Sequence, residues 1–497
     1  MRRSTSLILG FLLPLLLWQE GFAADTLTVS SQAEFEQLPL QLEEHLRDGS
    51  VHVLILPGIY YYGDSFLELD HLNCPKTILS FSGAGAILVG SKGDGGDAID
   101  CGYVDTLSLR PVDIRHPVRK AGSWPIPVLS RKGMYKIRCQ EPDLSPEEAV
   151  GMKVILSQWF KGAVYPVEKI AGGWLYFRKE KDWGVSMWAE LRFGRCLPRY
   201  ILCTQPERAD LYACHASSFL SVRHSRFASL RLTDLSFLGN GAGDGLICLE
   251  EAESDSMVVS GCVFSGIRSD CIVAAETDCL RVRNCTFSGN YLSCIRVYPG
   301  CRESLIRHNR FLDNGLMMTN APIVHCQGKG YRIVDNYFED FSYSAIGIGI
   351  HFTKDDVYGT SGIVEDNEIC MSDGFRSGVF RELIDAGAIY VWTRNENTVI
   401  RNNYVHDIDG PHGNRGIFAD DGAVNVEIAG NRVLRISKGY CIDIRKAFWV
   451  QRLRKSKIHK VNIGNRIHDN VVDGRVRIFV RKDDPTSYAV RNVHIQE

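Results

Sequence analysis

Apolar and polar residues alternate in short runs through the second half of the chain, and these runs recur. Residues 261–266 read Gly-Cys-Val-Phe-Ser-Gly, and residues 284–289 repeat the pattern as Asn-Cys-Thr-Phe-Ser-Gly. A period of two is that of a β-strand with one buried face, whereas an α-solenoid would show a period of 3.6. A repeat of this length predicts a solenoid in which each repeat forms one coil, and a propeller blade would need about 40–45 residues.

An asparagine followed two positions later by a large apolar residue continues the repeat, which gives eight coils in all. These segments are Asn309-Arg310-Phe311, Asn336-Tyr337-Phe338, Asn367-Glu368-Ile369, Asn403-Tyr404-Val405, Asn431-Arg432-Val433 and Asn465-Arg466-Ile467. Strands of successive coils pair about 4.8 Å apart, so equivalent residues stack and the asparagines can hydrogen-bond along a ladder. We therefore expect an all-β fold, a right-handed parallel β-helix.

A second strand recurs in each coil, and its outward residues form two adjacent columns. The strand begins with a small residue and an inward Ile, as in Cys271-Ile272, Cys294-Ile295, Pro322-Ile323, Ala345-Ile346, Ala388-Ile389, Gly416-Ile417 and Cys441-Ile442. Alternation then predicts one column of Val273, Arg296, Val324, Gly347, Tyr390, Phe418 and Asp443. The other column is Ala275, Tyr298, Cys326, Gly349, Trp392, Asp420 and Arg445.

The chain divides into four segments. Residues 1–23 have the basic start, the short apolar run and the small residues of a signal peptide, which predicts export to the periplasm or beyond. Residues 24–111 are expected to form a helical cap at 32–47 and the first coils. The coil pattern disappears in residues 112–216, which predicts an inserted β-rich domain, and residues 217–497 form the main β-helix.

Net charge and cysteine content narrow the class of protein. A net charge of −2 without a basic stripe gives no support for nucleic-acid binding. No run after the signal is long and apolar enough for stable membrane insertion. The 16 Cys suit a disulfide framework in an exported chain, or small buried side chains at repeat positions. Neither the disulfide pairing nor the oligomeric state follows from the sequence.

The late coils carry the candidate chemistry. Aromatic rings beside charged groups are typical of carbohydrate sites, and the substrate-binding candidates are Tyr390, Trp392, His412, Arg415, Phe418, Asp443 and Arg445. Asp420 and Asp443 should lie about 8 Å apart at Cα. Asp421 follows Asp420, and Asp385 precedes the strand of the coil before. Glycosidases use two carboxyl groups about 5–5.5 Å or 6.5–9.5 Å apart, so Asp385, Asp420 and Asp421 are the catalytic candidates.

Each candidate also has a structural interpretation. Asp420-Asp421-Gly422 is a common turn composition, and Asp385 could cap a turn. His412 and Arg415 belong to the predicted loop 409–415 over the cleft, where a lone His is usually only solvated. Arg445 could equally be a surface charge.

Three motifs resemble the right-handed β-helix glycoside hydrolases of gut bacteria, with glycoside hydrolase family 141 as the nearest named family. They are Asp385-Ala386-Gly387-Ala388-Ile389-Tyr390, Asn402-Asn403-Tyr404-Val405-His406-Asp407 and Gly416-Ile417-Phe418-Ala419-Asp420-Asp421-Gly422. The resemblance implies a pectin-lyase-like fold with Asp385 and Asp420 or Asp421 as catalytic acids. The chain departs from the family pattern at Phe418, where a Tyr is expected.

Three functions remain open. The first is a secreted glycoside hydrolase that acts on a plant or host polysaccharide or oligosaccharide and needs no cofactor or metal. The second is a polysaccharide lyase, in which Arg445, Lys446 or Lys438 would neutralise a uronate and the acidic cluster could hold Ca²⁺. The third is a noncatalytic carbohydrate-binding or adhesin module.

Overall fold

The computed structural model of the chain describes the coils and leaves several connecting segments outside its scope. The described residues are 25–63, 65–90, 114–115, 128–129, 134–138, 153–158, 161–166, 168–172, 174–178, 199–203, 218–239, 245–267, 269–290, 292–315, 322–349, 360–372, 387–392, 395–409, 414–420, 423–444, 450–453, 456–459, 464–478, 488–491 and 494–495.

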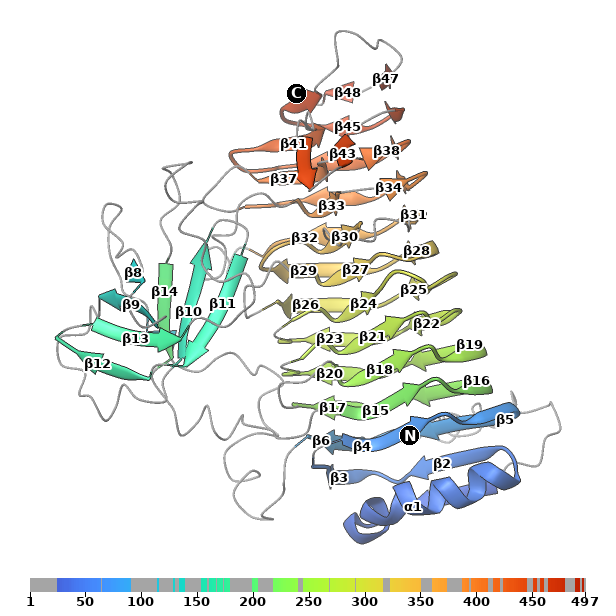
Figure 1. Cartoon of the computed structure of the whole chain (residues 1–497). Coiled ribbons are helices and arrows are strands. Elements are labelled where there is room, and N and C mark those ends of the chain that lie inside the picture. Colours follow the sequence, from blue (N-terminus) through green and yellow to red (C-terminus); the bar gives the residue numbers. More distant parts are fainter. Residues whose placement is uncertain are drawn as a thin grey trace, which may run out of the picture.

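Three long parallel sheets wind into a right-handed β-helix, as predicted (Figure 1). The 13-stranded sheet contains β1 (Asp25–Val29), β2 (Val51–Ile55), β5 (Asn73–Ser82), β16 (Arg226–Thr233), β19 (Glu253–Ser260), β22 (Leu280–Arg283), β25 (Leu305–Arg307), β28 (Lys329–Val334), β31 (Ser361–Glu365), β35 (Val399–Arg401), β39 (Glu427–Ala429), β44 (Asn465–His468) and β47 (Tyr488–Arg491). The 11-stranded sheet contains β4 (Ser65–Asp70), β15 (Ser218–Arg223), β18 (Ile247–Glu250), β21 (Ile272–Ala275), β24 (Ile295–Val297), β27 (Val324–Cys326), β30 (Ile346–Ile348), β33 (Ile389–Val391), β37 (Arg415–Ala419), β41 (Tyr440–Ile444) and β46 (Val476–Ile478).

The third sheet has 12 strands and completes each coil. It contains β3 (Gly58–Tyr61), β6 (Ala86–Val89), β17 (Ser236–Leu238), β20 (Val263–Ser265), β23 (Thr286–Ser288), β26 (Arg310–Asn314), β29 (Tyr337–Phe341), β32 (Glu368–Cys370), β36 (Tyr404–His406), β40 (Arg432–Leu434), β45 (Val471–Val472) and β48 (His494–Ile495). Short pairs are added by β34 (Asn395–Glu396) with β38 (Ala423–Val424), and by the hairpin β42 (Val450–Leu453) and β43 (Ser456–His459).

Eight strands between β6 and β15 form two antiparallel sheets of four strands each. They are β7 (Ile114–Arg115), β8 (Val128–Leu129), β9 (Met134–Arg138), β10 (Lys153–Gln158), β11 (Lys161–Pro166), β12 (Lys169–Ala171), β13 (Trp174–Arg178) and β14 (Arg199–Cys203). These sheets lie to one side of the solenoid (Figure 1). The coil pattern stops where they begin because their strands pair with one another instead of with the coils.

The helix α1 (Gln32–Asp48) covers the N-terminal end of the solenoid, which confirms the expected helix at 32–47 (Figure 1). The Ser31 hydroxyl accepts a hydrogen bond from the backbone N–H of Glu34 and caps the first turn. Phe35, Leu38 and Leu42 are fully buried, so the helix closes the open end of the core. No helix among the described residues combines the length and apolarity needed to cross a membrane.

A column of stacked phenylalanine rings fills the core of the early coils. The rings of Phe237, Phe264, Phe287, Phe311 and Phe338 follow one another with centroids 5.1, 4.7, 4.9 and 4.5 Å apart. This spacing matches the distance between paired strands. The register Phe264↔Phe287↔Phe311 places one ring in each coil, as the repeat predicts.

An asparagine ladder runs beside this core through Asn309, Asn336, Asn367, Asn403, Asn431 and Asn470. Each amide donates to the side-chain oxygen of the next asparagine at 2.9–3.0 Å. The prediction that Asn465 continues the ladder is wrong. Val433 pairs with Val472, so Asn470 is the equivalent residue, and Asn465 instead accepts from the backbone N–H of Val426 in another turn.

The ladder position of two early coils is occupied by cysteine. Cys262 and Cys285 direct their thiols to the backbone carbonyls of Leu232 and Val259, 3.6 Å away. The 11 cysteines whose side chains the structure describes are free thiols, and nine of them are buried. Small buried side chains at repeat positions therefore explain these cysteines better than a disulfide framework.

Charged residues form cross-coil ion pairs on the outer face of the 13-stranded sheet. The Glu365 carboxylate, whose side chain is 7% exposed, accepts from Arg332 at 2.8 Å and from Arg401 at 2.8 and 2.5 Å. Burial alone would raise the pKa of Glu365, but the hydrogen bonds from the two guanidinium groups outweigh it and lower that pKa.

The lowered pKa of Glu365 predicts a pH-dependent contribution to stability. A carboxyl with a depressed folded pKa stabilises fully above its unfolded pKa, here about 4.5, and loses this as the pH falls through the folded value. We expect Glu365→Gln to lower the free energy of unfolding at pH 7, and the gap to wild type to narrow by pH 3. Urea unfolding at both pH values measures the gap. The control Glu253→Gln, at an exposed pair with Arg226, should show almost none; a gap for Glu365→Gln that does not depend on pH contradicts the prediction.

Removing one ladder amide should destabilise the fold. Asn367 is buried, accepts from the backbone N–H and the amide of Asn336, and donates to the Ile333 carbonyl. Asn367→Ala leaves these groups without their partner in the interior, at a cost of about 2–4 kcal/mol. Chemical denaturation should show this loss, whereas Asn402→Asp at an exposed left-handed turn should change the free energy of unfolding by no more than about 0.5 kcal/mol. Equal effects of the two substitutions would rule out a special role for the ladder.

Candidate active site on the 11-stranded sheet

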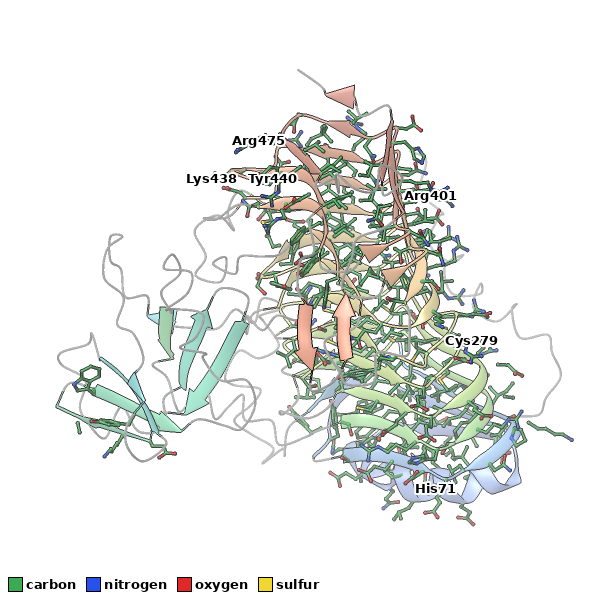
Figure 2. All side chains as sticks on the ribbon, turned by 45° about the horizontal axis from the view of Figure 1, so that its top comes forward. His71, Cys279, Arg401, Lys438, Tyr440 and Arg475 are labelled. Carbon is green, nitrogen blue, oxygen red and sulfur yellow. The ribbon has the colours of Figure 1, made fainter. Side chains whose placement is uncertain are left out.

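The outward face of the 11-stranded sheet gathers aromatic and charged residues in its later coils. The register runs His325↔Gly347↔Tyr390↔Phe418↔Asp443 across β27, β30, β33, β37 and β41. Because the strands pair in parallel, these residues stand about 4.8 Å apart in one column. Figure 2 shows the side chains that project from the solenoid at this level, where Lys438, Tyr440 and Arg475 lie at one edge and Arg401 lies across the coil.

Four of these side chains form a continuous row of stacked rings. Tyr390 stacks on Phe418 at 5.0 Å with the planes 4° apart, and on Trp392 at 4.7 Å. His325 continues the row on the other side of Trp392 at 5.3 Å. Glycine is required at position 347 between Pro322 and Trp392, because a Cβ there would lie 2.1 Å from the proline ring and 3.1 Å from the indole.

The Asp420 carboxylate contacts one residue of this row, Tyr390. Its backbone N–H donates to the Val391 carbonyl at 2.8 Å, which places Asp420 opposite Trp392 as predicted. The Tyr390 hydroxyl donates to Asp420 Oδ2 at 2.9 Å. Asp420 is only 4% exposed, so this hydrogen bond fixes the orientation of a carboxylate that water barely reaches.

The Asp443 carboxylate is held between two arginines. Arg415 Nε donates to Oδ2 at 2.6 Å, and Arg477 donates to both oxygens at 2.7 and 2.5 Å. The guanidinium of Arg415 lies 4.0 Å from the centroid of the Phe418 ring, and that of Arg477 lies 4.2 Å from Tyr440. The Asp443 side chain is fully buried, so its oxygens are engaged by the protein itself.

The structure brings together six of the predicted site residues: Tyr390, Trp392, Arg415, Phe418, Asp420 and Asp443. Arg415 begins the strand β37, and its guanidinium binds Asp443 inside the structure. The loop prediction therefore does not hold for this residue. Phe418 and Asp443 are fully buried and Arg415 is nearly so, which gives these three a supporting position behind the row. Asp385, His412, Asp421 and Arg445 lie outside the described residues.

One coil was placed in the wrong register from the sequence. Val324 pairs with Ile295, so Val324 and Cys326 face the core and not the outward columns. The outward positions belong to His325 and Gln327, whose side-chain nitrogens are 3.0 Å apart. Ile323 and Val324 are both apolar, so either could occupy the inward position of the strand. Only the polar residues at alternate positions, His325 and Gln327, indicate that Val324 is the inward one.

The arginine Arg477 was also missed. It belongs to β46 and lies opposite Asp443 in the register. The alternation Val476-Arg477-Ile478 is the signal that would have extended the outward column by one coil.

The thiols near the site are poor nucleophiles. Burial raises the pKa of the Cys441 thiol to about 11 and that of Cys326 still higher. Both groups therefore stay protonated at neutral pH, and the carboxylate of Asp420 is the better candidate for chemistry. Within the described part of the site, Asp443 is committed to arginines, so the residues seen there do not make the cage of oxygens that Ca²⁺ requires.

A family model and one solved structure agree with this architecture. Residues 224–349 match the family described as the right handed beta helix region. A glycoside hydrolase of known structure is 11% identical and superposes with a TM-score of 0.53, covering 95% of this chain and 97% of that one. The A-module of a mannuronan C-5 epimerase from Azotobacter vinelandii is 10% identical, covers 94% and 91% of the two chains and gives a TM-score of 0.34. An exopolygalacturonase from Thermotoga maritima is also 10% identical, covers 93% and 88%, and gives 0.28. No curated protein sequence matches the chain.

The buried Asp443 pair should be important for stability. Asp443→Asn removes the negative charge that neutralises two guanidinium groups, and loss of one partner from a buried ion pair costs about 3–5 kcal/mol. We expect the free energy of unfolding in urea to fall by that amount. Glu427→Gln, in a more exposed pair with Arg466, should cost less than about 1 kcal/mol. A wild-type stability for Asp443→Asn would show that the arginines do not depend on this carboxylate.

Proposed function

We propose that this chain is a glycoside hydrolase that cleaves a plant or host glycan at the later coils of the 11-stranded sheet. The observation that carries this proposal is the Asp420 carboxylate, oriented by the Tyr390 hydroxyl and placed opposite Trp392. A carboxyl group beside aromatic rings combines an acid for glycosidic cleavage with surfaces for sugar stacking. The glycoside hydrolase that shares this fold over almost its whole length is consistent with the assignment.

The roles of the neighbouring residues follow from their contacts. Trp392 and Tyr390 are proposed to contact the sugar. His325 stacks on Trp392 and lies 3.0 Å from the Gln327 amide, so these two residues add polar groups to the same face. Phe418 and Asp443 are positioning residues, because they touch Tyr390 and Arg415 and are themselves fully buried.

With Asp420 as one acid, the second carboxyl group is proposed to be Asp385, as the resemblance to family 141 implies, or Asp421, which follows Asp420 in the sequence. Asp443 is a poor second acid because both of its oxygens accept hydrogen bonds from guanidinium groups. The hydrolase needs one carboxyl to protonate the leaving group and another to act as base or nucleophile. His412 and Arg445 remain proposed substrate-binding residues, and export through the signal peptide at 1–23 would bring the enzyme to its glycan.

The described arginines give no support to the lyase alternative, whose candidates Arg445 and Lys446 lie outside the described residues. A lyase neutralises the uronate carboxylate with a cation. Arg415 of β37 and Arg477 of β46 both neutralise Asp443. Lys438 lies on an exposed turn, and exposure alone does not identify it as the cation that neutralises a uronate.

A glycan panel tests the proposal. Purified protein should release reducing ends from at least one glycan without new ultraviolet absorbance, whereas unsaturated products would identify a lyase. On that glycan, Asp420→Asn should lower kcat by about 10²–10⁴-fold, the range for a lost acid–base group. Tyr390→Phe should give a smaller loss, since the ring remains and only the hydrogen bond goes.

The matched control for Asp420→Asn is Asp366→Asn, an exposed left-handed turn residue that Asn fits equally well. It should keep wild-type activity. Full activity of Asp420→Asn would reject Asp420 as a catalytic residue. Glycan binding without turnover by the wild-type protein would instead support the adhesin alternative.

A further inference from the structure

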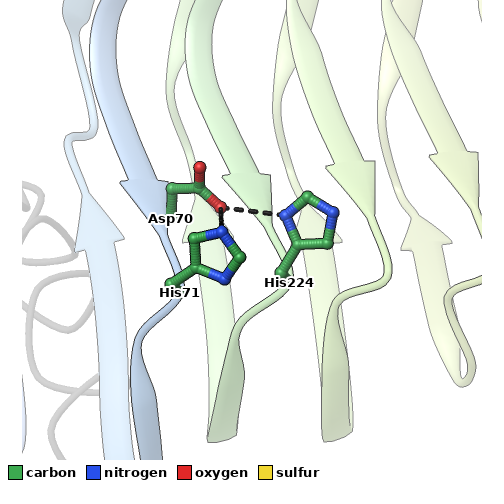
Figure 3. A group of neighbouring side chains, drawn as sticks. All are labelled: Asp70, His71 and His224. Atoms are coloured by element: carbon green, nitrogen blue, oxygen red, sulfur yellow. Dashed lines mark hydrogen bonds and ion pairs between the residues drawn. The ribbon is translucent and has the colours of Figure 1, made fainter.

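A cluster of one carboxylate and two imidazoles lies at the turn that leaves the 11-stranded sheet in the first two coils. Asp70 ends β4, His71 follows it, and His224 follows β15 in the next coil (Figure 3). Asp70 pairs with Arg223 in the register. The backbone N–H of His71 donates to the Arg223 carbonyl, so the two histidines occupy the same turn position one coil apart.

The two histidines share the backbone conformation of the turn. His71 and His224 have φ values of 54° and 45°, in the left-handed region where His, like Asn and Asp, is enriched among non-glycine residues. The equivalent residue of the following coil, Glu251, also lies there with φ of 47°. This shared turn directs the two imidazole rings alongside one another, 4.7 Å apart and nearly parallel.

The ligand atoms converge on one side of Asp70. Asp70 Oδ1 is 3.0 Å from His224 Nδ1 and 3.8 Å from His71 Nε2. The three residues can present one ligand atom each within 4.8 Å of one another. Figure 3 shows both rings turned toward the same carboxylate oxygen.

We propose that Asp70, His71 and His224 bind a divalent transition-metal ion of the zinc type. Tetrahedral ligands at about 2.0–2.1 Å from zinc stand about 3.3–3.4 Å apart, so shifts of a few tenths of an ångström to about 1.5 Å in exposed side chains complete the site. Two imidazoles and one carboxylate favour zinc, nickel or copper over calcium and magnesium, which prefer oxygen ligands alone.

A neighbouring carboxylate stands close to one of the ligands. His224 directs Nδ1 to Asp70 and leaves Nε2 facing Glu251 Oε1 at 3.9 Å. Metal-bound histidines commonly donate their second ring N–H to such a carboxylate, which fixes the tautomer and strengthens the ligand. In the proposed site Glu251 would take this supporting role by moving closer to Nε2, and water would complete the coordination of the metal.

The bound ion would join two coils that are far apart in the sequence. Asp70 and His224 are 154 residues apart, and the chain between them includes the two antiparallel sheets of β7–β14. An ion that binds only the folded arrangement stabilises it by mass action, and here it would hold the first coil against the second.

Zinc and cobalt titration of the metal-stripped protein tests the proposal. One equivalent of Zn²⁺ should bind and raise Tm, and Co²⁺ should give the visible absorption of a four-coordinate site, while Mg²⁺ does neither. His71→Asn and His224→Asn keep a side chain suited to the left-handed turn and should each weaken Zn²⁺ binding by more than about tenfold, since loss of even a supporting residue costs 10–100-fold.

The control variant is His308→Asn. His308 is also an exposed histidine at a left-handed turn, with φ of 55° and Asp335 3.2 Å away, but it belongs to no such cluster among the described residues. It should bind Zn²⁺ as the wild type does. Metal-free circular dichroism and Tm establish that each variant is folded. Absence of Zn²⁺ binding by the wild type, or equal affinity in folded His71→Asn and His224→Asn, overturns the proposal.

Discussion

The stacking of coils by parallel strand pairing is the constraint on which the rest of this structure depends. Equivalent positions of successive coils lie about 4.8 Å apart along the axis. A residue type whose side chain packs or hydrogen-bonds well against a copy of itself is therefore favoured at each position. In the interior this gives the phenylalanine column. At the turn it gives the asparagine ladder, where each oxygen accepts from the backbone and side chain of the preceding Asn and each amide donates to the next oxygen, so the buried polar groups are satisfied.

The same register builds the candidate site. The neighbours of each outward residue are determined by the strand register, because the preceding and the following coil pair with it at a fixed spacing. Tyr390 and Phe418 stack for this reason, and Asp420 meets Trp392 for the same reason. The charge of Asp443 is likewise neutralised by Arg415 from the preceding coil and by Arg477 from the following coil. A cleft on such a surface is therefore specified mainly by which residue each coil places in the column.

The sequence predicted the fold, the phenylalanine column and the alignment of Tyr390, Phe418 and Asp443, because in these coils a single inward residue fixes the register. It failed where two registers were equally apolar. Val324, and not the predicted Ile323, holds the inward register position opposite Ile295, so the outward position of His325 was missed. In the ladder, Asn470 takes the place predicted for Asn465. The burial of Phe418 and Asp443 could not be foreseen either, since alternation tells which way a side chain points and not what covers it.

Fixed spacing also limits which acids can work together under the proposed function. Residues at one column position in adjacent coils stand about 4.8 Å apart, close to the separation in retaining glycosidases, and a displacement of two residues along the strand lengthens it toward the inverting range. Asp443 has that displacement from Asp420, yet Arg415 and Arg477 neutralise it. The second acid must then approach Asp420 from the same coil or from the coil before, which is where Asp421 and Asp385 stand in the sequence. Because Arg415 and Arg477 engage Asp443, the coil that follows Asp420 supplies no second acid through this residue.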